Sequence, residues 1–381
     1  MKLLGYRPCT AKTRSSNKSN IESNEQNQLL VVRAPFLTIL GPKKRALQAR
    51  SLWVSVIMSD PFFIFIVLNY NGKHHLSYCL PTLCQMRYSN YKIVIVDNGS
   101  TDGSIALIKK HFQDIAIIET NKNIGYAGGN DVGIEYAKRL HAEFVVLLNN
   151  DTKVHPDFLR AMASFASVHP KAGIFVGKYY FMGTQTFQRV GGGYFTKDEK
   201  WGKNIGTNEK DKGQYDQPIK IDYVYEAAFV VRTSLFERIG LIDPLWQFSY
   251  EGPDLCKRAA KFNIETWYVP EAKVEHEVGG STRKRNFSLH LKIARNRFRF
   301  LLKHYSFHEA LVSELGCDLR SLRDMSVEPW DPFLNTYSLL WNLLQLSQTL
   351  ALKDLKREDY EDVYSKLLNG CIVFEAREVV K

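Results

Sequence analysis

The first half of the chain alternates between short apolar runs and longer segments with helical spacing. Strands are expected at Ile64–Leu68, Tyr91–Val96, Ile115–Glu119 and Phe144–Leu148, and helices at His75–Met86, Ser104–His111 and Ala127–His141. Strands that alternate with helices in this way are typical of βαβ units. The pattern therefore predicts an α/β fold with a mostly parallel central sheet and helices on both of its faces.

Polar residues follow the apolar runs at three of the expected strand ends. They are Asn69, Asp97 and the cluster Asn149, Asn150 and Asp151. The carboxyl ends of parallel strands share one edge of a sheet, where open α/β sheets bind ligands. A carboxylate there can bind a hard cation, and the cation can bind a diphosphate. The alternative for Asp151 is that its side chain only caps a turn.

A segment rich in small residues, NIGYAGGN, precedes or opens the third helix. Glycine there allows backbone N–H groups to approach a phosphate or a sugar closely, which makes Gly129 and Asn130 candidate ligand-binding residues. The segment is neither a Walker loop nor a GxGxxG motif, which argues against a dinucleotide-binding site.

The second half of the chain begins with an irregular stretch, residues 177–220, which we expect to be a partly β insertion over the crevice. Further elements are expected at Tyr223–Val231 (strand), Thr233–Ile239 (helix), Gly252–Phe262 (helix), Ile264–Val269 (strand) and Leu291–Tyr305 (helix). Gly252 and Pro253 suit the start of their helix, with Asp254 in its first turn. An apolar but polar-dotted segment, Phe333–Leu352, is expected to be a core or interfacial helix.

The bulk composition is that of a soluble globular protein, with 45% hydrophobic and 24% charged residues. Residues 1–57 carry +8 of the formal net charge of +11, so the basic character indicates no nucleic-acid partner for the body of the protein. This tail is expected to be disordered, an organelle transit segment, or an addition upstream of a true start at Met58. The body is expected to comprise a catalytic domain, residues 58–305, and a helical extension, residues 306–381.

The cysteines show no CxxC pair and no metal-finger spacing. We therefore expect reduced thiols and a cytoplasmic protein, with peripheral contact to the inner face of the cell membrane as an option. Arg283 to Arg285 and the arginine-rich helix after them are the basic residues that could meet anionic lipid, although a solvated face is the commoner meaning of such charge.

The motifs VLNYNG, VDNGSTDGS, NIGYAGGN, LLNNDT and YVPEAKVEHEVGGS occur in this order between residues 62 and 305. As a series they resemble family 2 glycosyltransferases, and most of all the rhamnosyltransferase-like enzymes that build bacterial surface polysaccharides. The resemblance implies a GT-A fold, a nucleotide-diphosphate sugar donor, a divalent metal, inversion at the anomeric carbon, and a glycan or lipid-linked saccharide as the acceptor.

The resemblance also implies roles for single residues. Asp97 would contact the base or ribose of the donor. Asp151 would bind the metal, with Asn149 in the place of the first residue of the DxD-like motif. His276 matches a second metal ligand, which favours Mn²⁺ and leaves Mg²⁺ as an alternative. Asn69, Gly129, Asn130 and Asn150 complete the predicted donor site.

The sequence departs from the family pattern at the acceptor side. The family commonly has Asp as its catalytic base where this chain has Gly252, and Gly where this chain has Glu226. Glu251, Asp254 and Glu226 are the remaining local carboxylates, and we expect Glu251 to be the base, with Asp254 as its rival. Alternatives to an active transferase are a degenerate member that binds a nucleotide sugar or glycan without turnover, and a nicotinamide-dependent oxidoreductase.

Overall fold

A computed structural model describes residues 60–197, 200, 202–246, 248–277, 287–323, 331–346, 349 and 372–374. The expectations for residues 1–57 and for Arg283 to Arg285 lie outside this range. The described residues from Pro61 onward belong to one compact unit.

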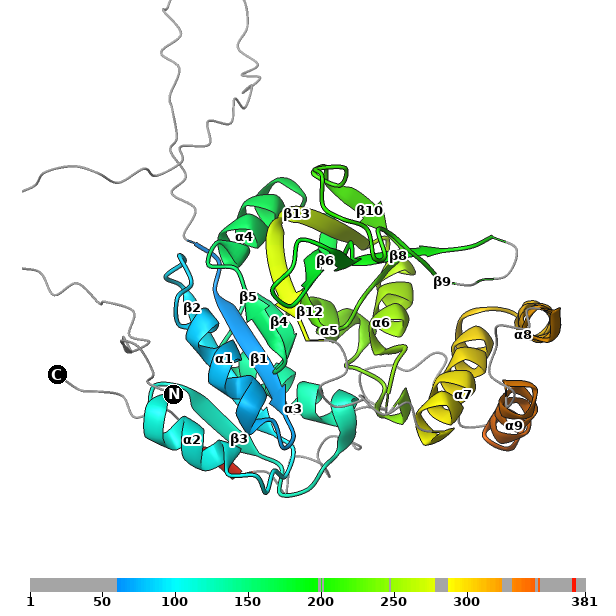
Figure 1. Ribbon diagram of the computed structural model, residues 1–381, viewed down its shortest axis with the longest axis horizontal. Coiled ribbons are helices and arrows are strands. Elements are labelled where there is room, and N and C mark those ends of the chain that lie inside the picture. Colours follow the sequence, from blue (N-terminus) through cyan, green and yellow to red (C-terminus); the bar gives the residue numbers. More distant parts are fainter. Residues whose placement is uncertain are drawn as a thin grey trace, which may run out of the picture. The chain divides into compact units, whose positions relative to one another are not determined.

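An eleven-stranded sheet forms the centre of the protein (Figure 1). Its strands are β1 (Phe63–Asn69), β2 (Tyr91–Asp97), β3 (Ala116–Glu119), β4 (Phe144–Asn149), β5 (Thr152–Val154), β6 (Ala172–Phe181), β7 (Phe187–Arg189), β10 (Ile219–Ile221), β12 (Ala228–Arg232), β13 (Glu265–His276) and β14 (Ile372–Phe374). The main path runs β10-β13-β6-β12-β4-β1-β2-β3-β14. A second, three-stranded sheet has the order β11-β8-β9, built from β8 (Gly192–Phe195), β9 (Gly202–Asn204) and β11 (Tyr223–Val224).

Strands β3, β2, β1 and β4 are parallel neighbours, as the alternation of apolar runs predicts. Their registers place Asn69 of β1 beside Asp97 of β2, and Leu68 beside Asn149 of β4. These strands are buried on both faces, which is why their sequences are almost continuously apolar. Their polar carboxyl ends therefore come together at one edge of the sheet.

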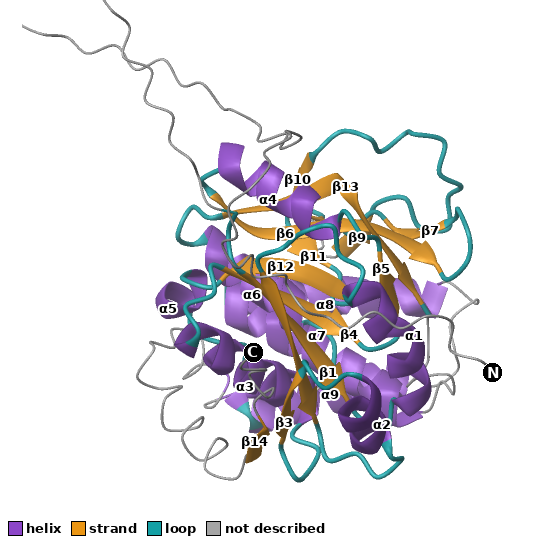
Figure 2. Ribbon diagram, turned by 90° about the vertical axis from the view of Figure 1, so that its left-hand side faces the viewer, coloured by secondary structure: helices purple, strands orange, loops and turns teal. Residues whose placement is uncertain are grey.

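Helices cover the sheet on both sides (Figure 2). They are α1 (Lys73–Leu83), α2 (Ser104–His111), α3 (Gly125–Arg139), α4 (Phe158–Val168), α5 (Leu235–Ile239) and α6 (Glu251–Ala260), with a 3₁₀ turn at Pro244–Trp246. Helix α3 lies very close to β1, because a Cβ added to Gly129 would fall 2.3 Å from Leu68 Cδ1. Three helices, α7 (Phe287–His304), α8 (Phe307–Arg323) and α9 (Asp331–Leu344), pack against one another, and the predicted division at residue 305 stays a prediction.

Several predicted boundaries are wrong in ways that matter for the site. The expected strand Tyr223–Val231 is two strands, because β11 pairs with β8 in the small sheet whereas β12 pairs with β4 and β6 in the large one. Helix α6 begins at Glu251 rather than at Gly252, after Tyr250 adopts a positive φ of 73°. Helix α3 begins at Gly125, so Gly129 lies inside the helix and not in a loop before it.

Two further expectations concern the membrane and the thiols. Among the described helices, none combines the length and the apolar character that crossing a bilayer requires. Cys79 and Cys256 are free and buried, as expected. Cys84 is disulfide-bonded, so the expectation of a reduced thiol is wrong for this residue, because sequence spacing does not show which thiols meet in space.

Candidate active site

Polar side chains from neighbouring strand ends form one hydrogen-bond network. Asn69 Nδ2 donates to Asp97 Oδ2 over 2.7 Å, and Asn150 Nδ2 donates to Asn69 Oδ1 over 2.8 Å. The backbone N–H of Ser100 donates to Asp97 Oδ1 over 2.8 Å. These contacts confirm that the strand ends converge at one edge of the sheet, although Asn69, Asp97 and Asn150 are not among the residues that line the cavity described below. They also show that Asp97, 2% exposed, uses both carboxylate oxygens to hold the edge of the sheet together, while its contact with a donor stays a prediction.

Asp151 and His276 meet where β4 ends and β13 ends. His276 Nε2 lies 3.2 Å from Asp151 Oδ1, and each residue is 6% exposed. The other ring nitrogen, Nδ1, lies 2.8 Å from Gln188 Oε1. An amide oxygen only accepts hydrogen bonds, so Nδ1 carries a hydrogen, and Nε2 faces the carboxylate of Asp151.

The carboxylate and the imidazole nitrogen form an ion pair when the ring is protonated, and they can serve together as cation ligands when it is neutral. Asp151 Oδ1 is buried and has no hydrogen-bond partner among the described residues. A carboxylate and an imidazole held by the Gln188 amide fit a divalent cation such as Mn²⁺. The described part of the chain brings no third His, Cys, Asp or Glu to this pair. An ion bound there would leave coordination positions open for a substrate and water.

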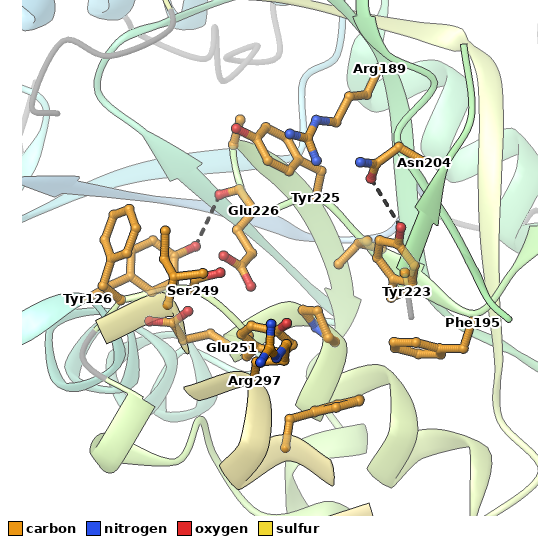
Figure 3. Close-up of a pocket in the computed structure, with 18 of the residues that line it drawn as sticks. Tyr126, Arg189, Phe195, Asn204, Tyr223, Tyr225, Glu226, Ser249, Glu251 and Arg297 are labelled. Atoms are coloured by element: carbon orange, nitrogen blue, oxygen red, sulfur yellow. Dashed lines mark hydrogen bonds between the residues drawn. The ribbon is translucent and has the colours of Figure 1, made fainter. Parts of the chain in front are cut away.

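A cavity of 560 Å³ lies beside this pair, between the end of β4, the β11–β12 segment, the start of α6 and helix α7 (Figure 3). Asn149 lines it at the end of β4. Tyr225 connects the cavity to the Asp151–His276 pair, because its ring centroid is 6.2 Å from that of His276. The guanidinium of Arg189 lies 4.3 Å above the same tyrosine ring, which brings a positive charge to the cavity wall.

Aromatic residues form much of the opposite wall of the cavity, with Phe195, Tyr223, Phe248, Tyr250 and Phe300 among them. Arg297 also lines the cavity but is bound to Glu314, with Nη2 2.6 Å from Oε1. Sequence reasoning missed Gln188, Arg189 and the aromatic wall. The first two lie in the irregular insertion, which has no periodicity to mark them, and the wall is assembled from distant segments.

Two glutamates in the cavity have raised pKa values. Glu226 is half-buried, and Glu251 is 1% exposed. Burial raises the pKa of Glu226 to about 7, against the lowering effects of the Gly252 N–H and of Arg189. Burial and the neighbouring charge of Glu226 raise the pKa of Glu251 well above its ordinary value. Both oxygens of Glu251 are buried with no hydrogen-bond partner in the described structure.

Asp254, the predicted rival base, makes contacts with neighbouring side chains that fit a structural role. Its Oδ1 lies 2.9 Å from Lys303 Nζ and 2.7 Å from His304 Nε2, and its Oδ2 accepts from Arg258 Nε over 3.0 Å. These cations lower its pKa well below the ordinary value although it is fully buried. A carboxylate saturated in this way is a poor proton acceptor, so a catalytic role for Asp254 remains a prediction that its contacts do not favour.

The remaining predicted donor residues lie around the strand ends. Gly129 is in the interior of α3 against Leu68, so close packing alone accounts for the glycine. Asn130 is 1% exposed, and its Nδ2 donates to the carbonyl oxygen of Tyr126 over 3.0 Å. Donor binding by these two residues, and by Asn149 and Asn150, stays a prediction.

Comparison with known proteins agrees with this architecture. Residues 64–240 match the family described as Glycosyl transferase family 2. The N-acetylglucosaminyl-diphospho-decaprenol L-rhamnosyltransferase of Mycobacterium tuberculosis is 23% identical over 234 residues, which are 57% of this chain and 76% of that protein. The dTDP-rhamnosyl transferase RfbF of Shigella flexneri is 20% identical over 257 residues, which are 63% of this chain and 80% of that protein.

Among solved structures, GalNAc-T7 with UDP, GalNAc and Mn²⁺ superposes with a TM-score of 0.52 at 13% identity, covering 74% of this chain and 54% of that one. The fold is therefore the GT-A fold of glycosyltransferases. Residues 64–240 therefore form a glycosyltransferase family 2 domain, and the chain resembles the rhamnosyltransferases of that family. Glu251 and His276 lie beyond the matched segment, so their roles rest on the geometry.

Proposed function

We propose that this protein is an inverting glycosyltransferase. It transfers a sugar from a nucleoside-diphosphate sugar to a saccharide acceptor, free or lipid-linked, during synthesis of a surface polysaccharide. The observation that carries the proposal is the buried Asp151–His276 pair beside a cavity that holds two glutamates. The names of the similar rhamnosyltransferases support the same class of reaction. The reaction would take place in the cytoplasm, and at the inner membrane face where the acceptor is lipid-linked.

Asp151 and His276 would hold the divalent ion. An imidazole nitrogen beside a carboxylate favours Mn²⁺ over Mg²⁺, because Mg²⁺ prefers a shell made of oxygen atoms alone. When bound, the ion supplies positive charge that stabilises the departing diphosphate. Gln188 orients the imidazole through Nδ1, so that Nε2 is directed at the ion site.

The cavity would receive the acceptor on the side of the sugar opposite the diphosphate. Its aromatic wall keeps water away from the reacting atoms, which strengthens every electrostatic contact inside. Inversion requires one displacement at the anomeric carbon and one group that accepts the proton of the attacking hydroxyl. The glutamates in the cavity are such groups, and no covalent intermediate with the protein is needed.

The test compares wild-type protein with Asp151→Asn, which keeps the shape of the side chain and removes its charge. Turnover of dTDP-rhamnose, UDP-N-acetylglucosamine and GDP-mannose is measured with Mn²⁺, with Mg²⁺ and with EDTA. We expect metal-dependent turnover of at least one donor, and a loss of roughly 10³-fold or more in the variant, because the charge that holds the ion is gone. Full activity in excess EDTA would contradict the proposal.

A degenerate member that binds a donor without turnover is the second candidate. It is favoured by one observation, the absence of a side chain at Gly252, where the family commonly carries its base. In that case a nucleotide sugar with Mn²⁺ would raise the melting temperature of the protein, and no donor would be turned over.

A further inference from the structure

Glu226 lies where the chain crosses from one sheet to the other. Strand β11 ends at Val224 and β12 begins at Ala228, and tyrosine hydroxyls fix the backbone between them. Tyr126 donates its hydroxyl to the carbonyl oxygen of Glu226 over 3.2 Å, and the hydroxyl of Tyr179 accepts from the N–H of Ala228 over 3.1 Å. This anchoring directs the Glu226 side chain into the cavity (Figure 3).

The Glu226 side chain fills the space in front of Gly252. A Cβ added to Gly252 would lie 2.9 Å from Glu226 Cγ and 3.1 Å from Val224 Cγ2. In place of a side chain, Gly252 offers its backbone N–H, which donates to Glu226 Oε1 over 2.6 Å. A side chain at position 252 would therefore crowd the Glu226 side chain, which would have to shift, and would also press against Val224. The chain departs from the family pattern at positions 226 and 252, and the side chains at these two positions compete for the same space.

Of the acidic side chains close to the start of α6, Glu226 is the one suited to take up a proton. Asp254 is held by Lys303, Arg258 and His304. Glu251 is almost inaccessible, and burial together with the neighbouring charge of Glu226 raises its pKa well above the ordinary value. Glu226 is partly accessible, and its pKa of about 7 matches that of a base working near neutrality.

We propose that Glu226, hydrogen-bonded to the N–H of Gly252, is the general base of this enzyme, an inference that rests on the proposed transferase function. The acceptor oxygen forms a bond to the anomeric carbon as the bond from that carbon to the diphosphate oxygen breaks. The diphosphate leaves with the bonding electron pair, and the Glu226 carboxylate takes the proton of the acceptor hydroxyl. The Gly252 N–H orients the carboxylate throughout.

The test uses the full chain and water as the acceptor, so that no natural acceptor is needed. Hydrolysis of dTDP-rhamnose, UDP-N-acetylglucosamine and GDP-mannose is followed with Mn²⁺, and the donor with the highest rate is used for the variants. Glu226→Gln should lower kcat by about 10²–10⁴-fold with the KM for the donor within about threefold of wild type. Glu237→Gln, an exposed glutamate on α5, is the matched control and should keep the wild-type rate.

The pH profile separates a base from a structural residue. Wild-type kcat should rise with pH and level off above about 7 as the Glu226 carboxyl loses its proton, and this rise should be absent in Glu226→Gln. Glu251→Gln should lose less than about tenfold, because the Glu251 side chain is almost inaccessible to an acceptor.

A wild-type rate in Glu226→Gln would overturn the inference and leave the transferase function intact. A loss confined to Glu251→Gln would make Glu251 the base and would also overturn it. A wild-type protein that hydrolyses none of the three donors would overturn both the function and the base.

An exchange of the two residues tests the shared volume directly. In Glu226→Gly the carboxylate is lost, and adding Gly252→Asp in the same chain returns one to the vacated space from the side of α6. We expect the double variant to turn over the donor at least about tenfold faster than Glu226→Gly. Such a gain is part of the rate increase that a general base contributes. A folded double variant that is no faster than Glu226→Gly would contradict the idea that a carboxylate from either position can act as the base.

Discussion

Two pairs of acidic side chains lie close to helix α6, and their pKa values are shifted in opposite directions. Asp243 and Asp254 are each 0% exposed, and their pKa values are lowered by Lys303 and by the arginines beside them. Glu226 and Glu251 have raised pKa values, and neither forms an ion pair with a lysine or arginine among the described residues, although the charge of Arg189 lowers the pKa of Glu226 in part. Removal from water acts on both pairs, and close ion pairing decides whether a carboxylate is held as an ion or can exchange a proton.

Helix α7 supplies the cations of the aspartate pair. Lys303 Nζ lies 2.9 Å from both Asp243 Oδ2 and Asp254 Oδ1, and Arg299 Nη2 lies 3.0 Å from Asp243 Oδ2. Asn296 of the same helix donates to the carbonyl oxygen of Phe248 over 2.7 Å. These contacts fix the segment that leads into α6. Helix α7 therefore holds the start of α6 in place by ion pairing, while Glu251 at that start and Glu226 beside it form no ion pair among the described residues and are available for proton transfer.

The largest expected effect is on the aspartate pair. Lys303→Met keeps the apolar stem and removes the charge, which leaves two buried carboxylates with fewer partners. We expect the free energy of unfolding to fall by about 3–5 kcal/mol, the usual cost of breaking a buried ion pair by removing one partner. Urea unfolding followed by circular dichroism measures the change, with Lys273→Met on the exposed face of β13 as the control. A loss below about 1 kcal/mol, as for surface pairs, would remove the contrast between the two pairs.

The parallel centre of the fold and the meeting of its polar strand ends at one edge of the sheet could be predicted from the sequence. Strands that are buried on both faces must be apolar throughout, so β1, β2 and β4 stand out, and their ends are marked by Asn69, Asp97 and Asn149. The hydrogen bonds among Asn69, Asp97 and Asn150 confirm that prediction.

The acceptor side could not be predicted in the same way. The run Tyr223–Val231 has the composition of one strand, and only pairing with two different sheets breaks it at Glu226. The crowding between Glu226 and a side chain at position 252 depends on two segments meeting in space, which no local pattern shows. Gln188 became identifiable as a partner of His276 only once β7 was placed beside β6.

A smaller effect is expected at Asp151, a further buried carboxylate, whose neighbour is an imidazole rather than a lysine or arginine. If Asp151 binds a cation from solution, then Gln188, which orients the imidazole of His276, should affect the affinity for that cation. Gln188→Leu should weaken Mn²⁺ binding by about 10–100-fold, the usual result of losing an outer-shell partner, with an unchanged melting temperature of the metal-free protein. Titration calorimetry with Mn²⁺ alone measures this, and Gln214→Leu on an exposed loop is the control. Equal affinities would show that Asp151 does not depend on this imidazole.

The smallest expected effect is the pH dependence of stability due to Glu226. Its pKa is about 7 in the folded state and 4.5 in its ordinary state, so the folded protein binds more protons between these values. The stability from this group is therefore full below about pH 4.5 and is lost as the pH rises through about 7. The aspartate pair has the opposite sign: its lowered pKa values give stability above pH 3.8 that is lost only in acid.

Glu226→Gln removes the pH dependence of stability that is due to Glu226 and leaves the dependence that is due to Asp243 and Asp254. Between pH 5 and pH 8, the difference in unfolding free energy between wild type and Glu226→Gln should shift by about 1–2 kcal/mol in favour of the variant. Urea unfolding at both pH values measures it, and Glu237→Gln should show no shift. A difference that stays constant would mean that Glu226 is ionised like a surface glutamate. The two acidic pairs would then share one charge state, and the cations of α7 would no longer explain why only one pair is available for proton transfer.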